Sequence, residues 1–404
     1  MPSNRPSPRN APQTKARSTT SVYPLKPKSA PYRKPARCHG CPLHSRGQGF
    51  GWPDGDGSSG ILIVGEALGE TEERTGTFFS GMAGWQLDIL LKRAGLSRET
   101  CTIENIIHCR PPNNRLAGAE YEREAIVHCQ PFLDATVDRV QPKVIVTLGN
   151  LPMRVLTGNS GISRHRGFVA ADNVHGIPVV PTFDPSFLLP RRQSKSSSKW
   201  TGPVVFDLRK AIRIAREGFT KLQTHYVLNP SPERADQFAQ EFLDSDAEWL
   251  SWDIETPYKM DAEDETKLDQ TIDTTILRVS FAFRPGYAIT MPWLPDYLPT
   301  IRRLLESGRK QVGWNVKAFD IPQVQRVGVT PVGDIHDGMN AWHVLQPYLP
   351  RSLEFVSSFF CDHLHPWKHL SKDEPTFYSC VDADAALVNM MGIMAAMREQ
   401  PVLH

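Results

Sequence analysis

Four carboxylates in the second half of the sequence have types and spacings suited to holding divalent metal ions. Asp253 and Glu255 lie two residues apart in the apolar segment WLSWDIE, so a β-strand would direct both side chains to one face. Burying like charges is costly, and metal binding is a reason for a strand to carry them. Asp320 and Asp382 add two more oxygen ligands, the type that Mg²⁺ and Mn²⁺ prefer. Four convergent carboxylates are what two-metal phosphodiester hydrolysis requires.

Two other polar residues accompany these acids. Tyr378 precedes Asp382 by one helical turn, so both side chains would face one cleft and the tyrosine would orient the attacking water. Asn315 begins the segment NVKAFD that ends in Asp320, and it is a candidate substrate contact. Asp384 is a lesser rival of Asp382 for the fourth metal position.

The seven cysteines form a second group with chemical potential. The sequence shows no secretory signal and is not small, so metal or cluster ligation is favoured over a disulfide framework. Cys38 and Cys41 form a C-x-x-C pair, and Cys109 and Cys129 follow later in the chain. On spacing alone, four thiolates could hold either a [4Fe–4S] cluster or a zinc ion. The other three are expected to be buried thiols: Cys101, Cys361 and Cys380.

Length and composition predict two globular domains behind a basic tail. The chain has 404 residues, of which 40% are hydrophobic, and it contains no apolar run long enough to predict a membrane span. Residues 1–37 hold nine of the 46 Lys and Arg, eight prolines and no acid, so we expect a disordered tail. Three interpretations of this tail remain open: contact with an anionic partner, solubility alone, or a mitochondrial transit peptide, whose helix the prolines would disfavour.

Residues 38–220 are predicted to form an α/β domain with a parallel sheet. Strands alternate with helices along this part of the chain, which is typical of parallel sheets. The predicted strands span 61–67, 101–107, 143–149 and 176–183, and the predicted helices span 82–94, 121–137 and 204–217. A polar, basic loop is predicted at 191–200.

Residues 224–404 are predicted to form a second domain with a mixed sheet. A strand at 225–229 and a helix at 231–244 come first, then a central strand at 248–256 and an antiparallel hairpin at 276–293. A helix at 298–307, a strand at 311–314 and further helix follow, including one at 338–347. This order is the layout of the ribonuclease H-like fold.

The first domain carries several motifs in a fixed order: GEALG at 65–69, FFSG at 78–81 and ENIIHCRPPNNR at 104–115. Over roughly residues 38–210 the chain resembles the iron–sulfur (family four) uracil-DNA glycosylases. This resemblance implies hydrolysis of the N-glycosidic bond of uracil flipped out of DNA. It also favours a [4Fe–4S] cluster over zinc, because the family's ligands fall on Cys38, Cys41, Cys109 and Cys129.

The resemblance assigns further residues to the glycosylase site. Glu66 would contact the flipped nucleotide or the catalytic water, and Phe79 would stack on the base. Asn105 would read the base edge, because an amide can donate to one base atom and accept from its neighbour. The remaining positions would contact DNA or match a further family position: Arg110, Asn114, Arg115 and Arg166.

Two positions depart from the family pattern. Leu68 stands where the family usually has proline, and Asp184 stands where the late loop usually has histidine. A carboxylate at that position would repel the anion that develops on the leaving base. The departure predicts catalysis that is weak, altered in substrate, or absent.

The second domain resembles the tyrosine-type DEDD exonucleases, as found in the proofreading domains of family-A DNA polymerases. The resemblance covers roughly residues 224–400 and is carried by the DxE, NxxxFD and YxxxD motifs. It implies 3′→5′ hydrolysis of DNA with two Mg²⁺ or Mn²⁺ ions.

The two resemblances together predict a bifunctional enzyme of DNA repair or replication. Its partners would be uracil-containing DNA and single-stranded 3′ ends, and a separate polymerase subunit is a further candidate. The alternative is a catalytically weak glycosylase-like module that binds DNA for the nuclease. The expected location is the cytoplasm of a bacterial or phage-infected cell, with no membrane partner.

Overall fold

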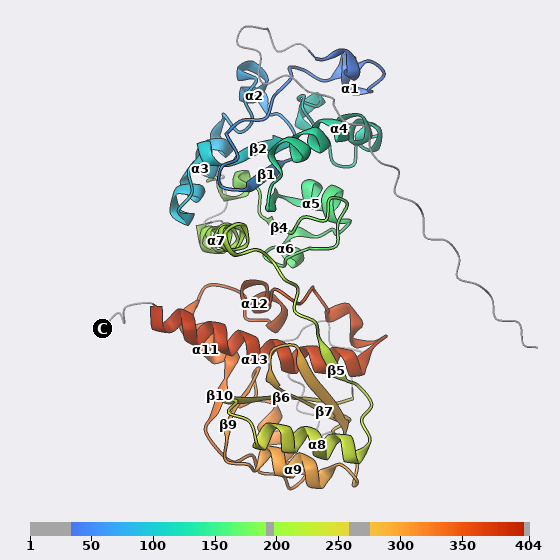
Figure 1. Cartoon of the computed structure of the whole chain (residues 1–404), viewed down its shortest axis with the longest axis vertical. Coiled ribbons are helices and arrows are strands. Elements are labelled where there is room, and N and C mark those ends of the chain that lie inside the picture. Colours follow the sequence, from blue (N-terminus) through green and yellow to red (C-terminus); the bar gives the residue numbers. More distant parts are fainter. Residues whose placement is uncertain (1–33, 191–197, 258–274, 400–404) are drawn as a thin grey trace, which may run out of the picture.

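The computed structural model describes residues 34–190, 198–257 and 275–399. Within them the chain forms two α/β halves, each built on its own sheet (Figure 1). The first sheet has four parallel strands and the second is a six-stranded mixed sheet, so the predicted fold class is confirmed. Most of the predicted basic tail and of the loop at 191–200 lies outside the described residues.

The first sheet is buried on both faces. Its strands are β1 (Ile61–Gly65), β2 (Thr102–Asn105), β3 (Val144–Leu148) and β4 (Val179–Thr182), in the order β2-β1-β3-β4. Every residue of these four strands is buried, which explains why β1 and β3 are continuous apolar runs without alternation.

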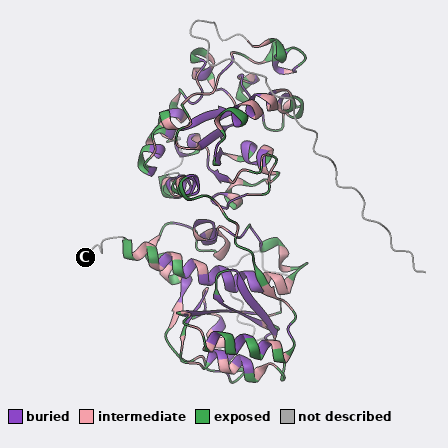
Figure 2. Cartoon of the chain, in the orientation of Figure 1, coloured by how far each residue is buried: buried purple, intermediate pink, exposed green. Residues whose placement is uncertain are grey.

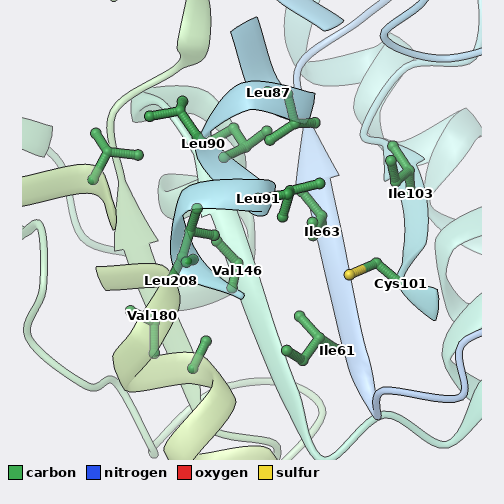
Figure 3. Close-up of a cluster of buried hydrophobic side chains, with 14 of the residues drawn as sticks. Ile61, Ile63, Leu87, Leu90, Leu91, Cys101, Ile103, Val146, Val180 and Leu208 are labelled. Carbon is green, nitrogen blue, oxygen red and sulfur yellow. The ribbon is translucent and has the colours of Figure 1, made fainter. Parts of the chain in front are cut away.

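Helices cover both faces of this sheet. On one face α3 (Met82–Ala94) and α7 (Thr201–Glu217) pack against Ile61, Ile63 and Val146, as Figure 3 shows for Leu90, Leu91 and Leu208. On the other face α4 (Glu122–Val140) and α5 (Asn150–Thr157) pack against Leu62, Val64 and Ile145. Three shorter helices lie in the connections: α1 (Leu43–Arg46), α2 (Glu70–Thr75) and α6 (Ile162–His165).

The second sheet has the order β10-β9-β6-β7-β8-β5. Its strands are β5 (His225–Val227), β6 (Trp249–Glu255), β7 (Arg278–Arg284), β8 (Tyr287–Pro292), β9 (Lys310–Gly313) and β10 (Ile335–Asp337). The antiparallel run β6-β7-β8 and the parallel additions β9 and β10 form the ribonuclease H-like arrangement, which β5 extends beside β8.

Helices also cover this sheet on two sides. The apolar residues of α8 (Pro232–Leu243) and α9 (Leu298–Leu305) pack against one face, where Trp252, Phe281 and Ile289 are buried. On the other face, α13 (Pro375–Glu399) packs on β6, β7 and β8. The remaining helices are α10 (Asp320–Arg326), α11 (Gly338–Leu345) and α12 (Leu353–Phe360).

Helix α13 is long and apolar enough to cross a membrane by length and composition alone. Within the structure, however, 61% of its apolar window is buried, and Figure 2 shows the buried class over the middle of α13. Its central place in the second half therefore accounts for its composition.

The two halves meet where α12 packs against α7 and α6. The Arg166 guanidinium donates to Ser358 Oγ at 2.8 Å, and the Lys210 ammonium donates to the Ser358 carbonyl at 2.9 Å. Lys210 and Arg213 both form ion pairs with Asp362. Polar and charged contacts of α7 thus fix the position of α12 relative to the first half.

Candidate functional site

The first candidate site lies at the carboxyl ends of the parallel strands, the usual ligand edge of such sheets. Gly65 ends β1 and is paired with Asn105, which ends β2. A Cβ on Gly65 would lie 2.4 Å from both Asn105 Oδ1 and the Phe79 ring. Glycine therefore allows the amide and the aromatic ring to meet at the strand end. Asn105 is 1% exposed, and its Oδ1 has no partner among the described residues, so this acceptor is free for a ligand.

Phe79 is held in a conformation that a non-glycine residue rarely adopts. Its φ of 51° lies in the left-handed region, at a cost of about 1–3 kcal/mol. The Arg98 guanidinium donates to the carbonyls of Phe78 and Phe79 and so holds this turn. A Cβ on Gly84 would lie 1.6 Å from the Phe79 carbonyl oxygen, so the first turn of α3 must approach closely as well. The Phe79 ring therefore reaches its place beside Asn105 through a strained backbone conformation.

Two acids stand at the same sheet edge. Glu66 follows β1, and burial together with the neighbouring Asp184 carboxylate raises its pKa. Asp184 follows β4, and burial raises its pKa, although its side chain accepts a hydrogen bond from the Ser186 amide at 2.8 Å. The Asp184 carboxylate therefore disfavours the ionisation of Glu66, the other predicted glycosylase acid.

The predicted DNA-contacting segment is partly exposed. Asn114 and Arg115 are exposed, whereas Arg110 is half-buried. The Arg110 guanidinium donates to Glu73 at 2.8 Å and to Asn114 Oδ1 at 2.6 Å. Arg110 thus braces this segment against α2, and Asn114 and Arg115 project from it.

The structure corrects the prediction for Arg166. Its side chain is 1% exposed and forms an ion pair with Asp207, which is 0% exposed. It also donates to Ser358 of the second half and lies 4.4 Å from the centre of the Phe359 ring. Its guanidinium is engaged by Asp207 and Ser358 at the junction between the halves, so it does not contact substrate.

The four predicted cluster ligands form one buried group. Cys41, Cys109 and Cys129 share an apolar cluster, and Cys38 packs beside Phe50 and Phe132. Burial and the neighbouring thiols raise the pKa of Cys38 to about 11; burial raises that of Cys109 to about 12 and that of Cys129 still further, and in both the neighbouring thiols add to the rise.

The backbone explains how these cysteines meet. Gln48 and Arg110 exchange two backbone hydrogen bonds of 2.9 and 2.8 Å, which tie the C-x-x-C segment to Cys109. The donor set suits a cationic metal centre, because a positive centre would stabilise thiolates that otherwise oppose one another. The other three cysteines are free and buried, as predicted: Cys101, Cys361 and Cys380.

A buried polar group next to this site was missed by sequence reasoning. Glu104 on β2 is 0% exposed, accepts from Thr136 Oγ1 at 2.7 Å, and lies 3.0 Å from His108 Nε2. It joins Asn105, whose backbone N–H donates to Glu104 Oε1, to His108, the residue before Cys109. The signal was present in the segment CTIENII, since an acid within an apolar strand is unusual there just as at Asp253.

The second candidate site gathers the predicted carboxylates. Asp253 and Glu255 of β6 and Asp382 of α13 each offer an oxygen within 4.8 Å of the others. Asp320 begins α10 and accepts a hydrogen bond from the Ile254 amide at 3.0 Å, which places it beside the same strand. Tyr378 lies beside Asp382 from one turn earlier in α13, and burial together with the Asp382 charge raises its pKa. Three of the four predicted carboxylates thus lie in one group, and the fourth is hydrogen-bonded to the strand that carries two of them.

These carboxylates oppose one another's ionisation. Burial, followed by the charges of Asp320, Asp382 and Glu255, raises the pKa of Asp253 well above its ordinary value. Burial is also the main cause that raises the pKa of Asp320 and of Asp382 to about 7. Oxygen ligands held this close fit divalent cations, which would compensate the charge.

Two neighbouring acids have structural duties. Asp337 accepts from the backbone amides of Asn315 and Lys317 at 3.3 and 3.2 Å and caps α11, so it holds the loop on which the half-buried Asn315 sits. Asp384 is 0% exposed and accepts from the Tyr226 hydroxyl at 2.6 Å and the Gly286 amide at 2.9 Å. Asp384 is therefore committed elsewhere and is not the fourth metal ligand.

Comparison with known proteins identifies the first half. Residues 52–209 match the model of the uracil DNA glycosylase superfamily. A type-4 uracil-DNA glycosylase of Thermotoga maritima is 38% identical over 161 residues, which cover 39% of this chain and 81% of that protein. A type-4 uracil-DNA glycosylase of Archaeoglobus fulgidus is 32% identical over 163 residues, with 39% and 80% covered. The chain therefore belongs to the type-4 uracil-DNA glycosylase family through its first half.

Solved structures give only distant similarity. A nuclease in its apo form has a TM-score of 0.29 at 12% identity and covers 45% of this chain and 83% of its own. The EXD2 exonuclease domain soaked in Mg and GMP has a TM-score of 0.23 at 14% identity, with 44% and 89% covered. The chemistry of the second half is therefore argued from its own residues.

The raised carboxylate pKa values predict an unusual response of stability to pH. Asp320 and Asp382 titrate near 7 in the metal-free fold and near 4 when unfolded. The folded state binds more protons between these values, so stability should fall as pH rises from about 4 to about 7. Thermal unfolding in EDTA should show this fall, and Mg²⁺ or Mn²⁺ should raise the midpoint more at pH 8 than at pH 5.

The variant Asp382→Asn is the control for this prediction, because asparagine has nearly the same size as aspartate but does not titrate. It should flatten the pH dependence in EDTA and weaken the stabilisation by metal. Equal stabilisation by Mg²⁺ at pH 5 and pH 8 would contradict the assignment of these acids as metal ligands.

Proposed function

We propose that this chain is a DNA repair enzyme that joins a uracil-DNA glycosylase module, residues 38–220, to a two-metal 3′→5′ exonuclease module, residues 224–404. The observation that supports the nuclease best is the convergence of Asp253, Glu255 and Asp382 within 4.8 Å. The glycosylase proposal rests on family membership and on the free Asn105 acceptor beside Phe79. The substrates would be uracil-containing DNA and single-stranded 3′ ends, with a polymerase subunit as a candidate partner.

In the glycosylase module, each side chain has a physical role. The Phe79 ring stacks on the flipped base, and Asn105 reads its edge through the buried amide. Glu66, whose pKa is raised, contacts the nucleotide or holds the attacking water. Asp184 opposes negative charge on the leaving base when it is ionised, and its raised pKa softens that opposition. Asn114 and Arg115 contact the DNA backbone.

In the exonuclease module, Asp253, Glu255, Asp320 and Asp382 hold two Mg²⁺ or Mn²⁺ ions. When bound, these ions supply activation of the nucleophile and neutralisation of the leaving 3′ oxygen. Tyr378 orients the attacking water from its place beside Asp382. Asn315 contacts the substrate from the loop that Asp337 fixes.

The alternative function is a DNA-binding, catalytically weak glycosylase module that tethers the nuclease. One observation favours it: the Asp184 carboxylate, which stands where the related loop usually carries histidine, disfavours the ionisation of Glu66. The host-cell cytoplasm remains the proposed location.

We expect a [4Fe–4S] cluster on Cys38, Cys41, Cys109 and Cys129. The anaerobically purified protein should be brown, with broad thiolate-to-iron absorbance near about 400 nm. Cys109→Ser should remove this absorbance, whereas the matched variant Cys101→Ser, at another buried thiol, should keep it. A colourless protein with one bound zinc would overturn the cluster assignment.

Uracil excision should depend on Asn105 and be limited by Asp184. Asn105→Ala should abolish it, because the base edge is left unread. Asp184→His should raise the rate by about tenfold or more, since it replaces a repelling carboxylate with a donor near the leaving anion. Asp184→Asn, of equal size and no charge, should give part of this gain. The measurement is alkali-labile cleavage of a labelled strand with one uracil, and a folded Asp184→His protein with an unchanged rate would refute this role.

The exonuclease should digest 5′-labelled single-stranded DNA from its 3′ end with Mg²⁺ or Mn²⁺, and EDTA should stop it. Asp253→Ala should lower the rate by more than about 100-fold, because that acid lies at the centre of the group. Tyr378→Phe should lower it about tenfold, the worth of one hydrogen bond of about 1.4 kcal/mol. Asp334→Ala, at an acid with 65% side-chain exposure, is the matched control and should digest normally. Equal digestion by Asp253→Ala and Asp334→Ala would exclude the two-metal assignment.

A further inference from the structure

A buried tryptophan connects the carboxylate site to the junction between the halves. Trp367 is 3% exposed, and its indole Nε1–H donates to Asp382 Oδ1 at 2.6 Å. Tyr378 lies beside the same carboxylate from one turn earlier, and burial together with the Asp382 charge raises its pKa. The short indole hydrogen bond limits where the Asp382 oxygens can lie.

The backbone of Trp367 is itself anchored by one acid of α12. The amides of Trp367 and Lys368 both donate to Glu354 Oε2, each at 2.8 Å. Glu354 sits in the first turn of α12, and its other oxygen accepts from the Arg164 Nε–H at 3.1 Å. Arg164 belongs to α6 of the first half, so one carboxylate links the glycosylase half to the tryptophan.

A second chain of contacts from the first half reaches the same helix. The Thr182 hydroxyl, at the end of β4, donates to Asp207 Oδ2 at 2.7 Å. Asp207 is paired with Arg166, whose guanidinium donates to Ser358 Oγ on α12. Thr182 lies two residues before Asp184 in the glycosylase loop. Helix α12 is therefore held from the first half at both Glu354 and Ser358.

We propose that Trp367 is a positioning residue for Asp382, and that Arg164 and Glu354 extend this hold, so that docking of the glycosylase half maintains the geometry of the nuclease metal site. The proposal rests on the exonuclease function proposed above and goes beyond it by naming what regulates that site. A shift of about 1 Å in a reacting geometry can cost about 100-fold in rate, so a support of this kind matters for catalysis. The expected effect is on metal affinity first, because Trp367 touches a ligand and no substrate.

The test uses the full chain with Trp367→Phe, which keeps an aromatic ring and removes only the N–H donor. Mn²⁺ binding is measured without DNA by the loss of the free-ion electron paramagnetic resonance signal, and with DNA by the Mn²⁺ concentration for half-maximal digestion. The Mn²⁺ dissociation constant and the Mn²⁺ concentration for half-maximal digestion should both rise at least about fivefold. The KM for DNA at saturating Mn²⁺ and the unfolding temperature should stay near the wild-type values.

Trp342→Phe is the matched control. Trp342 is 2% exposed in the same half, and its indole N–H donates to the Pro350 carbonyl at 2.9 Å, away from the acids. It should leave Mn²⁺ affinity unchanged. Glu354→Gln and Arg164→Met provide independent variants that keep the tryptophan, and each should weaken Mn²⁺ binding in the same direction by about twofold. In the Trp367→Phe background Arg164→Met should add no further loss, because the link is already broken.

The outcomes separate the two proposals. If the wild type does not digest 3′ ends, the proposed exonuclease function is wrong. The positioning role can still be tested, because the Mn²⁺ affinities of Trp367→Phe and Trp342→Phe are measured without DNA. If the wild type is active and Trp367→Phe binds Mn²⁺ as tightly as Trp342→Phe does, the positioning role is overturned. If Trp367→Phe weakens binding but Arg164→Met and Glu354→Gln do not, the link to the glycosylase half is overturned.

Discussion

The cost of burying like charges is the constraint on which both halves of this chain depend. Four thiols around Cys109 and four carboxylates around Asp253 are placed in interiors that raise the pKa of three of the thiols and of all four carboxylates. A fold that served stability alone would place apolar residues there, because unpaired buried charge is among the most expensive features a protein can hold. The elements that surround these groups therefore have to be stable enough to carry that cost. The first sheet meets this need with β1 and β3, which are apolar over nearly their whole length, and β6 of the second sheet buries Trp249, Leu250 and Trp252 beside its acids.

The first site shows how a parallel sheet turns distant motifs into one place. Parallel strands end at one edge, so Gly65, Asn105 and Asp184 come together although 119 positions separate the first from the last. The close approach at Gly65 then decides what can stand there, since a methyl group would displace both the Asn105 amide and the Phe79 ring. The strained φ of Phe79 serves the same arrangement, because the ring reaches its place only through a turn that Arg98 holds.

Periodicity in the sequence located helices and strands, but it could not predict which side chains contact one another across the fold. Helix α3 was predicted with its observed bounds, since its apolar residues recur at helical spacing and Gly95 ends it with a φ of 93°. The segment LEFVSSFF of α12 gave no such signal, because eight residues are shorter than the window of about 11–18 residues in which helical periodicity shows, and its helix is defined by burial between the two halves. The carboxylate site was predictable because its residues are related by short spacings: Asp253 and Glu255 lie two apart on a strand, and Tyr378 and Asp382 lie one helical turn apart. The role of Arg166 was not, since its partner Asp207 lies 41 positions away and no spacing rule links them.

The chemistry of α12 decides how firmly the halves are joined. Interfaces between domains of one chain allow relative motion unless they are large and apolar. Here Phe355 and Phe359 of α12 pack against Trp200 and Phe206 of the first half, with ring centres 5.9 and 5.1 Å apart. Separation of the halves would expose these rings and strip Lys210 of its contacts with Ser358 and Asp362. The same helix also carries Glu354, so the surface that holds the halves together is continuous with the contacts that hold Asp382. A rearrangement at the junction therefore has no route that leaves the second site untouched.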